Sequence, residues 1–199
     1  MNRTTVWTAA VLLPVLYALA RLTPWGREIS FTLHWGLAIS VIVWAIRTQG
    51  GTDGIGLKHA GLGLLAYALL VTAYCAVLIG VYKSEPLKGW QWAQIGWHSR
   101  WAVAFIAISA GFCEEVIFRG FLFTALKRTG NPLWLAMPAS TLSFVLFHGI
   151  LPLPLMVIFF IGGMIFVAVY HKTKNLWVTV VMHGVWDATV LLIPMESGA

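Results

Sequence analysis

The stretch Trp101–Leu126, WAVAFIAISAGFCEEVIFRGFLFTAL, decides how the chain folds. It is long and apolar enough to form a membrane-spanning helix. Yet it contains three charged residues within six positions, Glu114, Glu115 and Arg119. A charged side chain at the centre of a bilayer costs at least about 2.5–3.5 kcal/mol, so these charges must meet a structural or functional requirement.

Pairing along the helix accounts for two of the three charges. Glu115 and Arg119 are four residues apart, so they face the same side of a helix in the order that favours an ion pair. Glu114 is rotated about 100° from Glu115 by the helical period and has no partner nearby in the sequence. Glu114 is therefore the first candidate for a functional residue.

The composition indicates an integral membrane protein. Of 199 residues, 59% are hydrophobic and only 10% are charged, whereas soluble domains carry about 25% charged residues. Only helices and closed barrels satisfy their backbone groups in lipid, and the apolar runs are too long and continuous for barrel strands. We therefore predict an all-α fold, a polytopic membrane helical bundle that forms a single transmembrane domain over residues 1–199.

Windows of about 20 apolar residues predict about seven transmembrane helices. These are Thr5–Arg21, Ile29–Ile46, Ala60–Tyr82, Trp101–Leu126, Leu133–Ile150, Leu155–Tyr170 and Leu176–Ile193. The segment Lys83–Arg100 combines tryptophans with charged residues, which is typical of an amphipathic connector at the membrane interface. We expect residues 1–100 to supply peripheral helices and this connector, and residues 101–193 to form the catalytic helix core.

The net charge of +6 comes from Lys and Arg residues scattered over short loops. This pattern is typical of topology signals and lipid headgroup contacts, and it does not favour a nucleic-acid partner. The loops on the N-terminal side contain Arg3, Arg47, Lys58, Lys127, Arg128, Lys172 and Lys174, and the opposite side contains Arg21, Arg27, Lys83, Lys88 and Arg100. The excess favours a cytoplasmic N-terminus. The first apolar stretch also resembles a cleaved signal peptide, but the many spans that follow favour an uncleaved helix.

Three further polar residues lie deep in the last spans, namely His148, His183 and Asp187. At about 1.5 Å per residue, Glu114, His148 and Asp187 lie about 18–24 Å from one end of their helices, and His183 about 12 Å. Because the hydrocarbon core is about 30 Å thick, these side chains could meet around one buried cavity.

These residue types suggest hydrolytic chemistry. A buried carboxylate can act as a general base on water, and imidazoles can stabilise an oxyanion, transfer a proton or bind a metal. Asp187, one turn beyond His183, can fix the tautomer of that ring or hold a water. Zinc is possible at Glu114, His148 and His183, although the spacing matches no local zinc motif.

Two other features have a structural interpretation. His34 has no partner nearby in the sequence, and a single histidine in a membrane helix is more often a helix–helix hydrogen bond than a catalyst. Gly162 and Gly163 in the sixth span are expected to permit close helix packing.

The ordered set of motifs resembles the CPBP family of intramembrane proteases, also called the CAAX protease or Abi family. The pattern EExxxR is Glu114–Arg119, FxxxH is Phe144–His148, and HxxxN/D is His183–Asp187. The resemblance covers about residues 101–190 and implies hydrolysis of a peptide bond within the membrane. Residues 1–100 add only spanning helices and the connector.

The resemblance also implies roles for single residues. Glu114 would activate the water, supported by Glu115 and Arg119, and His148 would assist proton transfer. His183 and Asp187 would stabilise the oxyanion, although an ionised Asp would repel it. Asp187 must therefore be protonated, orient His183 or bind something else. We expect Phe118 and Phe144 to contact substrate, and a glutamate-based mechanism without a metal cofactor, with zinc as the alternative.

The resemblance narrows the substrate only to a membrane-anchored protein or peptide, cleaved near its C-terminal or anchoring segment. Eukaryotic members cleave prenylated CAAX tails, and bacterial relatives are linked to bacteriocin immunity, peptide-signal processing and removal of C-terminal anchors. The compact chain without a targeting signal suits the bacterial inner membrane, with lipid as a further partner. A non-catalytic immunity or scaffold protein and a proton-coupled transporter are the competing functions, and the absence of an internal repeat counts against the transporter.

Overall fold

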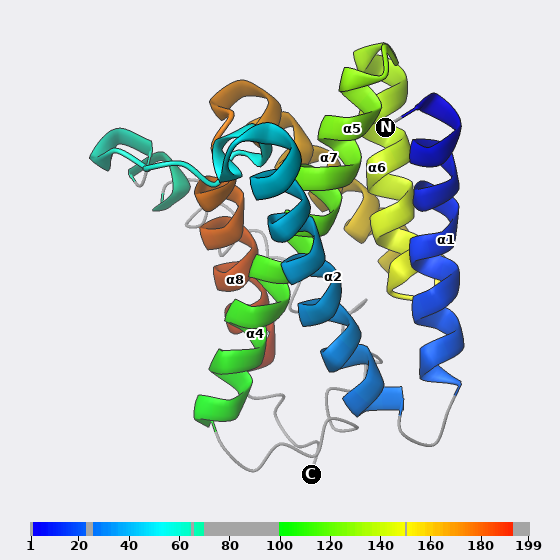
Figure 1. Ribbon diagram of the computed structural model, residues 1–199. Helices are drawn as coiled ribbons and strands as arrows, with labels where there is room; N and C mark the ends of the chain where they lie inside the picture. The colour runs from blue at the N-terminus through cyan, green and yellow to red at the C-terminus, as the bar shows by residue number, and fades with distance from the viewer. Residues whose placement is uncertain (1, 23–25, 65, 70–99, 150, 193–199) are drawn as a thin grey trace, which may run out of the picture.

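The computed structural model describes residues 2–22, 26–64, 66–69, 100–149 and 151–192, and these residues form helices and loops without a strand. The elements are α1 (Arg3–Arg21), α2 (Gly26–Gln49), the 3₁₀-helix η1 (Thr52–Ile55), α4 (Arg100–Glu114), the π-helix η3 (Glu115–Phe123), α5 (Thr124–Arg128), α6 (Leu133–Phe147), α7 (Leu153–Thr173) and α8 (Leu176–Leu192) (Figure 1). The predicted all-α fold is confirmed.

The helices have the composition of a membrane bundle. Within the described residues, α1, α2 and α7 are each long and apolar enough to cross a bilayer, and α6 is a shorter apolar helix. The elements α4, η3 and α5 follow one another without a break over the predicted span Trp101–Leu126. The predicted span Ala60–Tyr82 and the connector Lys83–Arg100 fall mostly on residues 70–99, which lie outside the described part.

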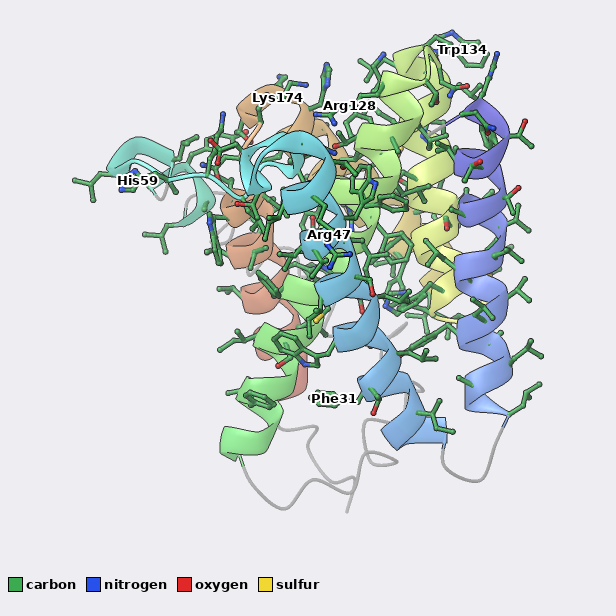
Figure 2. All side chains as sticks on the ribbon, in the orientation of Figure 1. Phe31, Arg47, His59, Arg128, Trp134 and Lys174 are labelled. Atoms are coloured by element: carbon green, nitrogen blue, oxygen red, sulfur yellow. The ribbon has the colours of Figure 1, made fainter. Side chains whose placement is uncertain are left out.

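The helices run up and down, so that alternate connections lie at the same end of the bundle. The start of α1, η1, and the turns from α5 to α6 and from α7 to α8 lie at one end, at the top of Figure 1. Arg47, Arg128 and Lys174 lie in the upper half of Figure 2, whereas Phe31 lies near the lower end. We call the upper end the basic end. The predicted distribution of Lys and Arg assumed that successive loops alternate between the two sides of the membrane, and the observed order of the helices agrees with that assumption.

Glycines allow helices to approach closely where the polar residues meet. A Cβ added at Gly111 of α4 would lie 2.8 Å from the backbone nitrogen of Gly184 in α8, so these two backbones are in contact. A Cβ at Gly163 of α7 would lie 2.8 Å from Thr141 Cγ2 of α6, whereas one at Gly162 would meet nothing within 4 Å. Close packing is thus confirmed for Gly163 and not for Gly162.

The π-helix η3 begins at the second glutamate, directly after Glu114. Its carbonyls receive hydrogen bonds from side chains, because Thr124 Oγ1 donates to Arg119 O at 3.0 Å and Ser140 Oγ donates to Phe118 O at 2.8 Å. π-helical segments are rare and frequently occur at functional sites. The chain therefore departs from α-helical geometry at the position that the sequence singles out.

The helix α6 ends earlier than predicted, at Phe147 rather than at Ile150. His148 caps it, and Gly149 follows with a φ of +91°, a left-handed conformation that stops helices and suits glycine. With 15 residues, α6 is about 22 Å long, which is less than the thickness of a hydrocarbon core. His148 consequently lies at a helix end, at the opposite end of α6 from the basic end.

Candidate functional site

Histidines from α2, from the end of α6 and from α8 approach Glu114 of α4. Its Oε1 lies 3.3 Å from Nε2 of His34, and its Oε2 lies 3.6 Å from Nε2 of His148 and 3.7 Å from Nε2 of His183. Glu114 itself is buried, with 4% of its surface exposed. The structure thus brings together Glu114, His148 and His183, as the sequence predicted, and adds His34 from α2. We call these four residues, with Asp187, the Glu114 cluster.

The neighbouring carboxylate has a different environment. Glu115 Oε1 lies 2.8 Å from Arg119 Nη1, and both residues are completely buried, so the predicted ion pair is confirmed. Arg119 also donates from Nη2 to Gly163 O at 3.3 Å, and its guanidinium carbon lies 4.5 Å from the centre of the Phe144 ring. We call Glu115, Arg119, Phe144 and Gly163 the Arg119 cluster.

His183 of α8 connects the two clusters through its two ring nitrogens. Nδ1 lies 2.9 Å from Glu115 Oε1, while Nε2 lies 3.7 Å from both Glu114 Oε2 and Asp187 Oδ2. A carboxylate paired with Arg119 accepts, so Nδ1 carries a proton and donates it to Glu115. Glu115 therefore fixes the tautomer of His183, a role for which the sequence had suggested Asp187, and Asp187 faces the other nitrogen.

His148 is held in the same way. Its Nδ1 lies 2.9 Å from Phe144 O, and because a carbonyl can only accept, Nδ1 carries the proton. In the neutral ring, Nε2 then has a lone pair directed at Glu114. Both His148 and His183 are thus oriented to receive a proton on Nε2 and to return it.

His34 is the residue whose place in the site the sequence interpretation missed. As expected, it makes a helix–helix contact, since Nδ1 lies 3.2 Å from the hydroxyl of Tyr17 in α1. Its other nitrogen, however, faces Glu114. A signal was available, because an ionisable side chain within a membrane span is a functional candidate by default.

Phe118 and Phe144, the predicted substrate contacts, lie in the core. Phe118 is fully buried and Phe144 is 5% exposed, and their rings meet edge to face with centres 5.5 Å apart. The Phe144 ring also lies 4.8 Å from the His148 ring. Their observed role is therefore to pack around the polar residues, and contact with substrate stays a prediction.

The zinc alternative can be compared with the arrangement of donors. Glu114, His148 and His183 are suitable zinc ligands by type. Among the described side chains, however, no three His, Cys, Asp or Glu residues are arranged to hold one metal ion. The zinc alternative therefore stays a prediction, and we derive no step through a metal.

Exposure is uneven within the Glu114 cluster. The side chains of Glu114 and His183 are each 5% exposed, whereas those of His148 and Asp187 are 17% and 23% exposed. The accessible edge of the cluster is therefore formed by His148 and Asp187, where α6 ends away from the basic end.

Comparison with known proteins agrees with this geometry. Residues 96–189 match the family described as type II CAAX prenyl endopeptidase Rce1-like. We call residues 96–189 the Rce1-like segment. Comparison with curated proteins and comparison with solved structures each gave no match.

The Rce1-like segment contains all three motifs and the elements from α4 to most of α8. The resemblance seen in the sequence is therefore confirmed, and the match together with the apolar helices indicates an integral membrane protease. Helices α1 and α2 lie outside the Rce1-like segment, and so do Tyr17 and His34.

Proposed function

We propose that the protein is an intramembrane endopeptidase in which Glu114 activates a water molecule for attack on a peptide carbonyl. The observation that carries the proposal is the position of Glu114 Oε2. This buried atom has no hydrogen-bond partner among the described residues, and it faces Nε2 of His148 and of His183 at 3.6 and 3.7 Å. These separations are long for direct hydrogen bonds, and a water molecule can bridge Oε2 to an imidazole.

The reaction needs one proton to move twice. Glu114 takes a proton from the water while the water oxygen bonds to the carbonyl carbon, which produces a tetrahedral oxyanion. His183 stabilises that oxyanion when its Nε2 carries a proton. The proton then passes from Glu114, directly or through His148 Nε2, to the leaving nitrogen as the C–N bond breaks. The products are a carboxylic acid and an amine.

The position of the accessible edge supports a substrate class. If the basic end faces the cytoplasm, as the positive-inside rule favours, the end of α6 at His148 and the second half of α8, which contains Asp187, lie towards the outer side of the membrane. A C-terminal membrane anchor of an exported protein can reach that side, whereas a prenylated cytoplasmic tail cannot. We therefore propose a membrane-anchored substrate of the first kind, and we propose the bacterial inner membrane as the location.

The test is cleavage by the purified protein in proteoliposomes. Two probes separate the substrate classes, a peptide with a C-terminal hydrophobic anchor and a farnesylated CAAX peptide. We expect Glu114→Gln and His148→Ala to lower the rate about 100- to 10,000-fold, because each removes a group that transfers protons. Asp53→Asn and His59→Ala, which change exposed residues of the same types, should retain activity. Full activity in Glu114→Gln and His148→Ala would exclude this mechanism.

A chelator distinguishes the zinc alternative in the same assay. For a glutamate-based enzyme, incubation with 1,10-phenanthroline should leave the rate unchanged. Loss of activity that added zinc restores would support the metal-dependent version instead.

A further inference from the structure

One polar side chain from outside the Rce1-like segment reaches the proposed base, and a second one contacts the first. Tyr17 of α1 has its hydroxyl 3.2 Å from His34 Nδ1, and His34 of α2 has its Nε2 3.3 Å from Glu114 Oε1. The three residues form a chain of contacts from α1 through α2 to α4. None of the three motifs includes Tyr17 or His34.

Aromatic packing fixes the position of this chain. The Tyr17 ring stacks on Phe147 with centres 3.8 Å apart and planes 18° apart. The His34 ring meets Tyr17 and Phe147 edge to face, at 4.9 and 4.8 Å. Tyr17 is 5% exposed and Phe147 is 1% exposed, so neither ring has space to move independently. The imidazole of His34 is consequently held at one position beside Glu114.

The hydrogen-bonding capacity of these groups selects one tautomer of His34. The Tyr17 hydroxyl can donate to Nδ1, and Nε2–H can then donate to the Glu114 carboxylate. This tautomer is opposite to that of His148 and His183, which carry their protons on Nδ1. In the neutral state, His34 therefore turns an N–H towards Glu114 Oε1 at 3.3 Å, outside regular hydrogen-bond geometry, while the other two imidazoles present lone pairs to Glu114.

We infer that His34, held by Tyr17, is a positioning residue that fixes the Glu114 carboxylate. The terminal torsion of a glutamate side chain is broad, so a carboxylate needs contacts to hold its orientation. His34 contacts Oε1, which leaves Oε2 directed at His148 and His183. This inference rests on the proposed function, since it assigns to His34 the orientation of the general base.

The test measures kcat and KM for cleavage of the anchored peptide in proteoliposomes. His34→Phe keeps an aromatic ring against Tyr17 and Phe147 and removes the donor. We expect kcat to fall about 10- to 100-fold, as for the loss of groups that orient reactive residues, with KM changed by less than about twofold. His34→Gln, whose amide can donate from a similar position, should recover most of kcat.

Tyr17→Phe gives an independent measurement, because it keeps the stacking on Phe147 and removes only the hydroxyl. We expect kcat to fall about two- to fivefold, and to fall no further when Tyr17→Phe is added to His34→Phe, because the hydroxyl acts only through His34. His59→Phe and Tyr67→Phe are matched controls at exposed positions and should leave kcat unchanged.

The outcomes separate this inference from the proposed function. If Glu114→Gln is inactive while His34→Phe and Tyr17→Phe both keep the wild-type kcat, the positioning role is excluded and the protease mechanism stands. If Glu114→Gln is active, the proposed function itself fails. Where His34→Phe does not fold, His34→Gln and Glu114→Gln are combined in a double-mutant cycle of melting temperatures in detergent. Additive effects in that cycle would overturn the contact between the two side chains.

Discussion

The Arg119 cluster and the Glu114 cluster are neighbours in the structure. Each contains one of two consecutive glutamates, and the two carboxylates differ in the distance to their partners. Glu115 is fully buried and lies 2.8 Å from Arg119 and 2.9 Å from His183. Glu114 has its polar partners farther away, at 3.3 to 3.7 Å. One oxygen of each carboxylate makes no hydrogen bond among the described residues, so the contact distances distinguish the two glutamates. The Arg119 cluster is closed to solvent, whereas the Glu114 cluster reaches an accessible edge at His148 and Asp187.

This difference shows how one helix can hold a structural and a reactive carboxylate in sequence. A buried ion pair with short contacts has little freedom, and removing one partner leaves an uncompensated charge. A carboxylate with longer contacts to imidazoles can exchange protons without breaking the bundle. We therefore expect changes in the Arg119 cluster to act on stability and changes in the Glu114 cluster to act on rate.

The largest effect on stability is expected at Arg119. Arg119→Met leaves Glu115 buried without its cation and removes the donor to Gly163 O, so we expect a loss of about 3–5 kcal/mol in the free energy of unfolding. Reversible unfolding in detergent measures this loss. Adding Glu115→Gln to Arg119→Met should recover part of it, because the unpaired charge is then removed.

Arg128→Met is the matched control for Arg119→Met. Arg128 lies in α5 of the same helical stretch, is exposed, and donates to Gly54 O at 3.2 Å. It should change the free energy of unfolding by less than about 1 kcal/mol. Equal losses in Arg119→Met and Arg128→Met would show that the Arg119 cluster has no special structural role.

Much of this comparison could be predicted from the sequence. The four-residue spacing of Glu115 and Arg119 predicts their ion pair, and the depth of His148 and His183 in apolar spans predicts that they meet near Glu114. These predictions depend on local periodicity and on the exclusion of charge from lipid, which act on any helix. The helical fold and the order of the spans could be predicted for the same reason.

The rest depends on tertiary contacts that periodicity does not encode. His34 comes from a different helix, so no spacing connects it with Glu114, and its ring position depends on Tyr17 and Phe147. The end of α6 at Phe147 depends on the left-handed conformation of Gly149 within an otherwise apolar run. Both glutamates reach nitrogens of His183, although an ideal α-helical rotation of about 100° separates their directions.

A smaller effect on stability is expected at Gly163, which supports the Arg119 cluster from α7. In Gly163→Ala, the new methyl would lie 2.8 Å from Thr141 Cγ2 and 3.4 Å from Arg119 Nη2, so the Thr141 side chain or the spacing of α6 and α7 must shift. We expect a loss of about 1–3 kcal/mol from overpacking. Gly162→Ala is the adjacent control, with nothing within 4 Å of the new methyl, and should be neutral or slightly stabilising. A loss of similar size in Gly162→Ala would show that an added methyl group destabilises α7 at either position, and that the clash at Gly163 is not the cause.

The smallest effect is expected at Asp187, on the accessible edge of the Glu114 cluster. Its Oδ2 lies 3.7 Å from His183 Nε2, too far for a strong hydrogen bond, and Glu115 already holds the other nitrogen of that ring. Asp187→Asn keeps the size of the side chain and its capacity to accept while removing the charge. We expect kcat/KM to change by less than about fivefold, or about 1 kcal/mol in transition-state stabilisation.

The direction of the change in Asp187→Asn distinguishes two roles of the aspartate. A faster enzyme would mean that the negative charge opposes the oxyanion, since an amide can donate to it and a carboxylate cannot. A moderately slower enzyme would mean that the charge helps to keep a proton on His183 Nε2, where the oxyanion needs a donor. A loss as large as that of Glu114→Gln would contradict the assignment of Glu114 as the base on which the rate depends. A partly exposed residue with only long contacts would then be as indispensable as the proposed base.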